Sequence, residues 1–359
     1  MPISLSDPLI LGHGPTWPNR VALAPLTNTQ SHADGTLSDE ELAWLTARGR
    51  GGFGLTMTCA AYVSPAGQAW GGQLGIAGDE HLPGLARLAQ ALRQTGTRSS
   101  VQLHHAGRRA DPAVTGRPLQ CPWAPDATTP AMTTAEIGAV ISDFAGAAVR
   151  AEQAGFDGVE LHGAHGYLIG QFLDGRHDDR TDGYGGTPQN RARMLFEVLA
   201  EVRRATGPGF QVGLRLTPEG NGITVDEGRE TARRVLASGL VDYLDMSLWD
   251  VFMYPRAGGD RLLIDHFVDL PRHGTRLGVA GRVLSSKDAA WCLDRGADFV
   301  SVGIGGILHH DWAARAIADP RFAARERPVS ADVLRREHVG PAFIDYLDRG
   351  WENFVAAGR

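Results

Sequence analysis

Eight short apolar runs are the feature of this chain that most constrains its fold. Each run is rich in valine, leucine or other apolar residues and is continuous, which is typical of strands that are buried on both faces. The runs are VALAP (21–25), GLTMT (54–58), SVQLH (100–104), GVELH (158–162), VGLRL (212–216), YLDMS (243–247), LGVAG (277–281) and FVSVG (299–303). Longer segments with helical signals separate the runs, so the pattern predicts about eight βα units.

The helical segments carry recognisable start and stop signals. Ser38 precedes a group of acidic residues and predicts a helix start, and serine or threonine followed three residues later by an acid predicts further starts. These pairs are Thr133 with Glu136, Thr224 with Glu227 and, more weakly, Ser285 with Asp288. Glycine accepts the left-handed conformation that ends a helix. Such glycines stand shortly before predicted strands at Gly96, Gly155, Gly207, Gly239 and Gly296.

Parallel strands joined by right-handed helical crossovers close into a barrel when there are eight of them. We therefore predict an α/β fold, a (β/α)8 TIM barrel, in preference to an open doubly wound sheet. No segment between the units resembles a linker, so residues 1–359 are expected to form a single domain with a C-terminal tail at 320–359. The long, proline-rich segment 105–131 is expected to be a loop on the functional face.

Composition excludes several classes of function. The net charge of −6 leaves no basic excess for binding nucleic acid. No apolar run is long enough to span a membrane, and the N-terminus does not resemble a signal peptide, so we expect a cytoplasmic protein. Cys59, Cys121 and Cys292 are too far apart in sequence for a CxxC or iron–sulfur motif. Lys287 is the only lysine and stands at a predicted helix start, which disfavours a Schiff-base aldolase.

Polar and glycine residues gather at the carboxyl ends of the predicted strands. They are Thr27, Cys59, Gln102, His104, His105, His162, His165, Tyr167, Arg215, Gly281 and Gly303. In a TIM barrel these ends meet at one mouth, where active sites lie. Glycines after the last two strands are typical of phosphate binding, because their backbone N–H groups are accessible to an anion. The pattern therefore predicts a phosphate-bearing cofactor at the mouth.

The pair His162 and His165 permits two interpretations. With His104, His105 or Glu160 the pair could bind zinc, which predicts a metal-dependent TIM-barrel hydrolase. As hydrogen-bond donors, the two imidazoles would hold a substrate oxygen on which negative charge develops. Arg215 is expected at the same mouth, and a cation is unfavourable beside a metal ion. This favours the second interpretation, but both interpretations stay open at this point.

The segment GVELHGAHGYLIGQFLDGRHDDRTDGYGGTPQNRARMLFEVL (158–199) resembles the Old Yellow Enzyme family of FMN-dependent ene-reductases. The shared marks are H-x-x-H, GYL, QFL, RTDGYGG and NRAR. NRVALAPLT (19–27), VQLHHAGR (101–108) and LRLTPE (214–219) also resemble the family. The resemblance covers nearly the whole chain and implies a TIM-barrel flavoprotein, an oxidoreductase that uses FMN and either NADPH or NADH.

The resemblance also implies roles for individual residues. The flavin ring would rest on Ala24, Pro25, Leu26 and Thr27. Thr27 would hydrogen-bond the flavin's carbonyl edge, and the Ala60 backbone would face the same edge. Gln102 would hydrogen-bond the pyrimidine side, and Arg215 would lie by the N1–C2=O edge. Gly281 and Gly303 would bind the phosphate. His162 and His165 would hold the oxygen of an α,β-unsaturated carbonyl or nitro compound while hydride arrives from flavin N5, and Tyr167 would protonate the α-carbon.

One departure from the family pattern and one further resemblance, in the C-terminal tail, lead to further expectations. The family usually has an arginine after the strand-eight glycine, whereas Ile304 follows Gly303 here, so Arg282 is expected to supply the missing charge. If the phosphate is held weakly, a flavin-binding redox protein without turnover is an alternative. The tail YLDRGW (346–351) resembles that of the thermophilic-like branch, whose arginine reaches a neighbouring subunit. This implies a homo-oligomer in which Arg349 contacts the substrate, and a surface helix end is an equally open interpretation.

Overall fold

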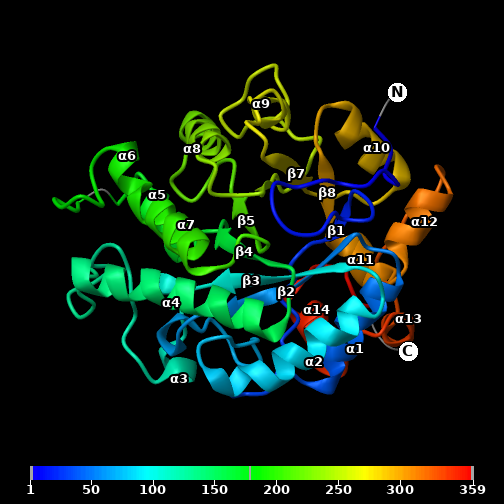
Figure 1. The fold of residues 1–359 in the computed structure, drawn as a ribbon, viewed down its shortest axis with the longest axis horizontal. Helices are drawn as coiled ribbons and strands as arrows, with labels where there is room; N and C mark the ends of the chain where they lie inside the picture. Colours follow the sequence, from blue (N-terminus) through cyan, green and yellow to red (C-terminus); the bar gives the residue numbers. More distant parts are fainter. Residues whose placement is uncertain (1–2, 178, 357–359) are drawn as a thin grey trace.

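The computed structural model describes residues 3–177 and 179–356, and its eight strands form a closed parallel barrel, as predicted (Figure 1). The strands are β1 (Val21–Leu23), β2 (Leu55–Tyr62), β3 (Arg98–His104), β4 (Gly158–Gly163), β5 (Gln211–Leu216), β6 (Tyr243–Ser247), β7 (Arg276–Ala280) and β8 (Phe299–Val302). Each strand pairs with its neighbour in sequence, and β8 closes the barrel on β1 through Ala22 and Ser301. The order rules out the open sheet.

Helices surround the barrel and connect its strands. The long ones are α1 (Asp39–Arg50), α2 (Leu82–Arg93), α4 (Thr134–Ala154), α7 (Arg193–Ala205), α8 (Val225–Ala237), α10 (Ser286–Asp294) and α14 (Pro341–Gly350). The short ones are α3 (Pro112–Thr115), α5 (Leu168–Leu173), α6 (Pro188–Arg191), α9 (Asp265–Val268), α11 (Ile304–Leu308), α12 (Trp312–Ala318) and α13 (Ala331–Arg336). Only the four-residue α9 lies between β6 and β7, so a long loop there reaches the barrel mouth.

The predicted helix starts are confirmed. The side chains of Ser38, Thr133, Thr224 and Ser285 each accept a hydrogen bond from a backbone N–H in the first turn of the following helix. The last three form complete capping boxes with the acids three residues on, including the weaker Ser285 pair. The predicted stop at Gly155 is also confirmed, because this residue adopts φ 90° directly after α4.

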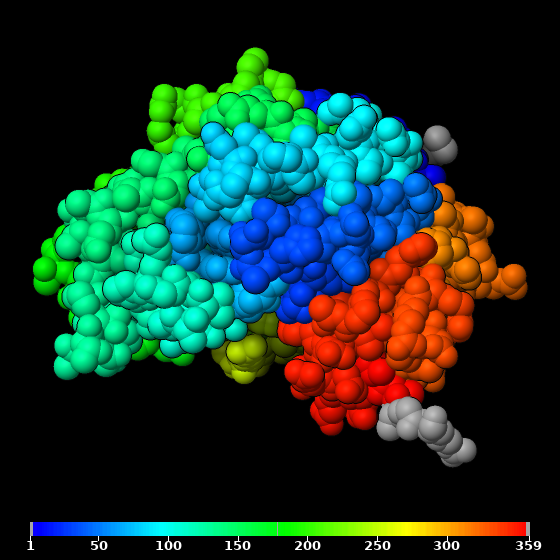
Figure 2. Space-filling model, turned by 90° about the horizontal axis from the view of Figure 1, so that it is seen from below, coloured from blue at the N-terminus to red at the C-terminus, as the bar shows by residue number. Residues whose placement is uncertain are grey.

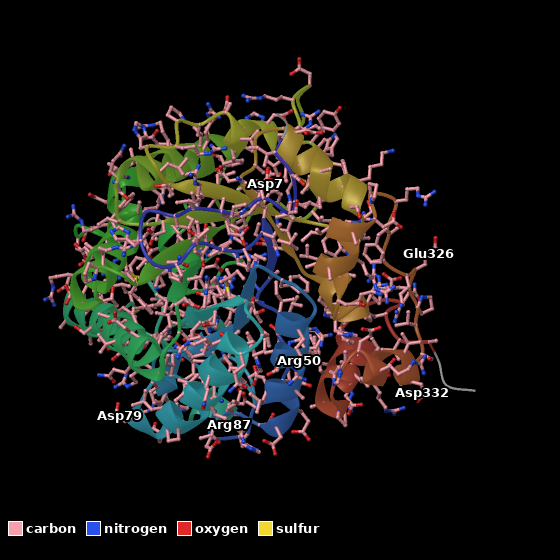
Figure 3. The ribbon with its side chains drawn as sticks, turned by 45° about the vertical axis from the view of Figure 1, so that its right-hand side comes forward. Asp7, Arg50, Asp79, Arg87, Glu326 and Asp332 are labelled. Carbon is pink, nitrogen blue, oxygen red and sulfur yellow. The ribbon has the colours of Figure 1, made fainter. Side chains whose placement is uncertain are left out.

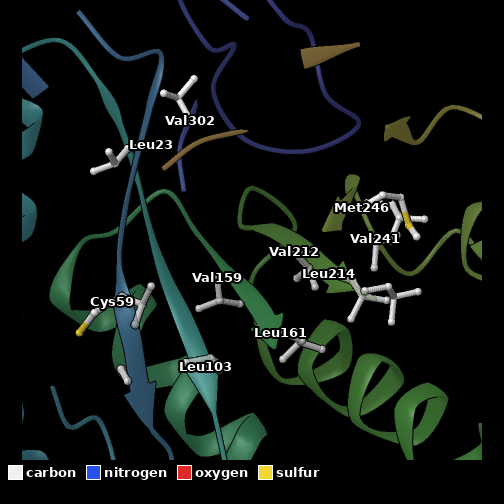
Figure 4. Packing of buried hydrophobic residues seen from close by; sticks show 14 of the residues in the cluster. Leu23, Cys59, Leu103, Val159, Leu161, Val212, Leu214, Val241, Met246 and Val302 are labelled. Atoms are coloured by element: carbon white, nitrogen blue, oxygen red, sulfur yellow. The ribbon is translucent and has the colours of Figure 1, made fainter. Parts of the chain in front are cut away.

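The two faces of the barrel strands differ in chemistry. Valines and leucines such as Val159, Leu161 and Leu214 face outward and pack under the helices (Figure 4). Alternate residues of the same strands, Glu160 and Arg215 among them, are equally buried and face the barrel interior. The apolar cores therefore lie between barrel and helices, while the upper interior of the barrel is polar.

The amino end of the barrel is closed by a separate apolar cluster. The Trp17 ring lies 5.2 Å from Tyr243 and 5.1 Å from Phe299, measured between ring centroids. Its indole Nε1 donates a hydrogen bond to the Gln211 side-chain oxygen at 3.0 Å, which fixes the ring across the barrel floor. Because this end is filled, a ligand must enter from the carboxyl ends of the strands.

The C-terminal segment packs beside α1, far from it in sequence (Figure 2). The rings of Trp44 and Phe343 are 5.0 Å apart, and the Gly340 backbone N–H donates to the Gln30 side-chain oxygen at 2.9 Å. Charged side chains such as Arg87 and Glu326 point outward from the surface (Figure 3). Among the described helices, none has both the length and the apolar character needed to span a membrane.

Candidate active site

A cavity of about 580 Å³ opens among the carboxyl ends of the strands and the loops that follow them. This volume lies in the range usual for small-molecule and cofactor sites. Its lining includes the predicted residues Ala24, Pro25, Leu26, Thr27, Ala60, Gln102, His162, His165, Tyr167, Arg215, Gly281, Arg282 and Gly303. These residues lie at or just after the carboxyl ends of seven of the eight strands, so the barrel brings them together at its mouth, as predicted.

Other residues of the cavity were not singled out by the sequence reasoning. The polar ones are Arg109, Asn221, Ser247, Arg256, Ser301 and Tyr346, and Trp351 from the C-terminal segment joins them. Ser247 and Ser301 lie within the predicted runs of β6 and β8, so strand position alone could have indicated them. Trp70 and Trp249 also line the cavity. Phe252 and Tyr254, two aromatic residues that follow Trp249 in the same loop, do not line it, and the Phe252 ring packs on Trp291 with 4.6 Å between ring centroids.

Among the residues to which the resemblance gives a role, Arg349 alone does not line the cavity. Three buried residues that were also expected at the mouth do not line it either, namely Cys59, His104 and His105. Arg349 lies on the outer surface of α14, where its side chain is 82% exposed, and its guanidinium is 3.6 Å from the Asp345 carboxylate. The tail reaches the cavity of its own chain through Tyr346 and Trp351. A role for Arg349 toward a neighbouring subunit therefore stays a prediction.

His162 is held so that one ring nitrogen faces away from the cavity. The Ala164 backbone N–H donates to His162 Nδ1 at 3.2 Å. A ring nitrogen that accepts a hydrogen bond carries no proton, so the proton of the neutral imidazole is on Nε2. Burial, with smaller effects from His165 and His104, lowers the pKa of His162 well below its usual range. His162 is therefore a neutral donor at neutral pH.

His165 lies beside His162, with 5.0 Å between the ring centroids. Its Nε2 is 2.8 Å from the Ser247 hydroxyl, which accepts a hydrogen bond from Arg215 at 3.2 Å. Burial and then the nearby Arg215 cation lower the pKa of His165 to about 3. The two imidazoles thus form a neutral pair that can hydrogen-bond an oxygen without bringing a formal positive charge to it.

Tyr167 completes this part of the cavity. Its ring lies 5.0 Å from that of His162 and 4.3 Å from that of His104. Burial raises the pKa of the Tyr167 phenol, and the Arg109 guanidinium, 4.4 Å above the ring, opposes this shift. The phenol is therefore protonated at neutral pH and can donate a proton to a group held by the histidines.

Below the mouth, a charged layer fills the barrel interior. Gln102 donates to the Glu160 carboxylate at 2.8 Å, and Arg215 forms an ion pair with Asp245 at 3.6 Å. Glu160 Oε2, both Asp245 oxygens and Arg215 Nε are buried without a hydrogen-bond partner. Burial, followed by the nearby Asp245 carboxylate, raises the pKa of Glu160 to about 8. An unpaired Arg215 Nε–H at the cavity is a donor suited to a polar cofactor edge.

The opposite end of the cavity suits a phosphate. Gly281 and Gly303 carry no side chain that would cover their backbone N–H groups. A Cβ at Gly281 would lie 2.9 Å from the Asp250 backbone nitrogen, so only glycine fits there. Arg282 lines the same region, although its guanidinium also pairs with Asp250 at 3.1 Å. With the apolar floor near Ala24, these groups fit the ring, edge and phosphate of FMN.

Backbone strain is concentrated around this cavity. His165, Asn221, Trp249 and Arg282 all line it, and all adopt left-handed φ values between 50° and 64°. Such conformations are unfavourable for residues with a side chain and persist where the surrounding structure imposes them, often at functional sites.

The geometry does not favour the zinc hydrolase. Within residues 3–177 and 179–356, the one group of three possible ligands with metal-site spacing is His310, Asp311 and Glu337, which does not line the cavity. Arginines already pair with its carboxylates, Arg315 with Asp311 and Arg325 with Glu337, each at 2.8 Å. His162 and His165 instead make the hydrogen bonds described above.

Comparison with known proteins decides between the remaining interpretations. The model of the NADH:flavin oxidoreductase / NADH oxidase family matches residues 4–254. The chain belongs to this family. A probable NADH-dependent flavin oxidoreductase, YqiG, of Bacillus subtilis is 34% identical over 336 residues, which cover 87% of each chain. Family membership disfavours the hydrolase and identifies the protein as an FMN-dependent NAD(P)H oxidoreductase.

Solved structures place the chain among the Old Yellow Enzyme homologues of this family. Morphinone reductase has a TM-score of 0.79 and 29% identity, with 98% of each chain covered. An Old Yellow Enzyme homologue from Zymomonas mobilis also has a TM-score of 0.79, with 27% identity, covering 92% of this chain and 96% of the other. The predicted family, fold and cofactors, FMN with NADPH or NADH, are therefore confirmed.

Proposed function

We propose that this Old Yellow Enzyme family member is an ene-reductase that reduces the activated C=C bond of α,β-unsaturated carbonyl or nitro compounds. The observation that carries this proposal is the meeting of two imidazoles and a phenol in one cavity, where the His162 ring lies 5.0 Å from both the His165 and the Tyr167 ring. A substrate oxygen needs donors when negative charge develops on it, and the adjacent carbon needs a proton source. His162, His165 and Tyr167 supply both.

The histidines bind and polarise the acceptor. His162 directs its protonated Nε2 away from the Ala164 amide, and Ser247 fixes the ring of His165. Because Ser247 is itself held by Arg215, the pair is oriented before a substrate arrives. Pre-oriented donors in a site shielded from water stabilise developing charge without reorganisation.

Residues at the other faces of the cavity would hold FMN. The segment Ala24 to Thr27 would support the ring, Gln102 and Arg215 its polar edge, and the backbone N–H groups of Gly281 and Gly303 its phosphate. The chemistry that FMN would supply there is hydride transfer, with NADPH or NADH as the source of the hydride. Tyr167 then gives its phenolic proton to the carbon beside the activating group, and Arg109 above the ring stabilises the phenolate that remains.

Anaerobic half-reactions test this function. The purified yellow protein is reduced by NADPH or NADH, and a panel of enones, maleimides and nitroalkenes is then added. Reoxidation with formation of the saturated product supports the proposal. Bleaching by a nicotinamide followed by reoxidation with oxygen alone, and with no alkene of the panel, would show a flavin oxidoreductase of another specificity.

A further inference from the structure

The cavity carries more positive charge than its cofactor accounts for. Four arginines line it, namely Arg109, Arg215, Arg256 and Arg282, and no aspartate or glutamate among the described residues does so. The chain as a whole has a net charge of −6, so this concentration of cations is a local feature. A cavity lined by one sign of charge attracts ligands of the opposite sign.

Carboxylates outside the lining balance two of the four cations. Asp245 lies below Arg215 at 3.6 Å, and Asp250 pairs with Arg282 at 3.1 Å beside the proposed phosphate position. Arg109 and Arg256 have no ion pair with any carboxylate of the described chain. Glu219 accepts hydrogen bonds from the Arg256 backbone N–H and not from its guanidinium.

Arg109 lies next to the residues that would contact the acceptor. Its Nη1 donates to the His165 backbone oxygen at 2.7 Å, and its guanidinium is 4.4 Å from the centre of the Tyr167 ring. These two contacts fix the position of the side chain and leave further N–H donors available. A guanidinium presents its donors as a planar fork that matches a carboxylate.

Arg256 adds charge from the loop after β6. Its guanidinium lies 6.0 Å from the centre of the Trp249 ring, which in turn lies 5.3 Å from the His165 ring. Arg109 thus contacts the His165 backbone directly, and Arg256 approaches His165 through the Trp249 ring.

We propose that the alkene acceptor of this enzyme carries a carboxylate and that Arg109 binds that carboxylate beside Tyr167, with Arg256 adding attraction from the Trp249 side. That the ligand is an alkene substrate rests on the proposed function. That the cavity binds a carboxylate rests only on the two unpaired arginines. The phosphates of a nicotinamide dinucleotide are the other oxyanions that could meet these cations, so the test separates the two sources.

The first arm measures binding to the flavin-loaded enzyme by calorimetry. Benzoate and benzamide are used as probes, because they have nearly the same shape and differ in charge. We expect the wild type to prefer benzoate, and Arg109→Gln to lose roughly tenfold to a hundredfold in benzoate affinity with little change for benzamide. Arg109→Lys keeps the charge and should retain part of the preference. Arg321→Gln, at a side chain that is 93% exposed, is the matched control.

The second arm measures the two half-reactions separately. An enoic acid and its amide reoxidise the reduced enzyme, and the dissociation constants of NADPH and NADH are obtained from the reductive half-reaction. Loss of the acid's advantage in Arg109→Gln, with unchanged nicotinamide affinity, supports the inference. If Arg109→Gln keeps the wild-type preference for benzoate, the inference is overturned. It is also overturned if the variant loses affinity only for NADPH and NADH, because the arginines would then bind the phosphates of the dinucleotide. Reoxidation by no alkene, charged or neutral, overturns the proposed function, while the benzoate arm still decides the carboxylate position.

Discussion

The buried carboxylates below the cavity lead to a quantitative prediction about stability. Glu160 and Asp245 are both fully buried and share a single nearby cation, Arg215. Gln102 on β3, Tyr243 on β6 and Ser301 on β8 are the other groups that face them, and none of these is charged at neutral pH. Two carboxylates with one cation in a medium of low dielectric constant favour retention of one proton.

The magnitude follows from proton linkage. Burial and Asp245 raise the pKa of Glu160 to about 8, whereas a glutamate in the unfolded chain ionises near its ordinary pKa of 4.5. Between these values the native state holds a proton that the unfolded chain has released, so stability falls as pH rises. One fully retained proton changes the free energy of unfolding by about 1.4 kcal/mol per pH unit. Because the native carboxyl is already half deprotonated at a pH equal to its pKa, the loss between pH 6 and pH 8 is about 2 kcal/mol.

Glu160→Gln removes this titration and keeps an oxygen to accept the hydrogen bond from Gln102. We compare the free energy of unfolding of the variant with that of the wild type at each pH. We expect this difference, variant minus wild type, to become about 2 kcal/mol more positive from pH 6 to pH 8. Urea unfolding at fixed FMN concentration, followed by circular dichroism, measures the difference. Glu326→Gln, at an exposed position, is the control and should track the wild type. Parallel curves for Glu160→Gln and the wild type would refute the retained proton.

Two further predictions concern the phenol and a helix cap. Tyr167→Phe should slow reoxidation by enones about a hundredfold or more and leave reduction by the nicotinamide unchanged, because it removes only the proton donor; stopped-flow absorbance separates the two rates. Equal slowing of both would show that the phenol has a structural role. Thr224→Ala removes the capping box at the start of α8 and should cost about 1 kcal/mol in urea unfolding, whereas Thr224→Ser should cost much less.

The strand runs made the barrel and the placement of most site residues predictable. A short apolar run fixes where a strand ends, and in a TIM barrel that end is the mouth. For this reason Gln102, His162 and Arg215 could be assigned to the cavity from sequence position alone. The continuous runs concealed one feature, since Glu160 and Asp245 face a polar barrel interior and were not expected to form a charged layer.

Residues outside the strands were harder to predict, because long-range packing places them. Arg109 follows β3 in a loop and reaches the cavity only through its contacts with His165 and Tyr167. Tyr346 and Trp351 reach it because the C-terminal segment packs beside α1, which no local pattern specifies. The single-domain organisation of residues 1–359, the homo-oligomer and the role of Arg349 stay predictions.

The most direct test of the account compares reoxidation of the reduced wild type with that of the His162→Ala/His165→Ala double variant, using a simple enone in anaerobic stopped-flow experiments. Removal of a pre-oriented donor to developing negative charge typically costs about a hundredfold or more in rate. We therefore predict that the double variant retains its flavin, is reduced by the nicotinamide, and transfers electrons to the enone at least about a hundredfold more slowly. A double variant that saturates the enone at the wild-type rate would contradict the central claim that the paired imidazoles bind the acceptor.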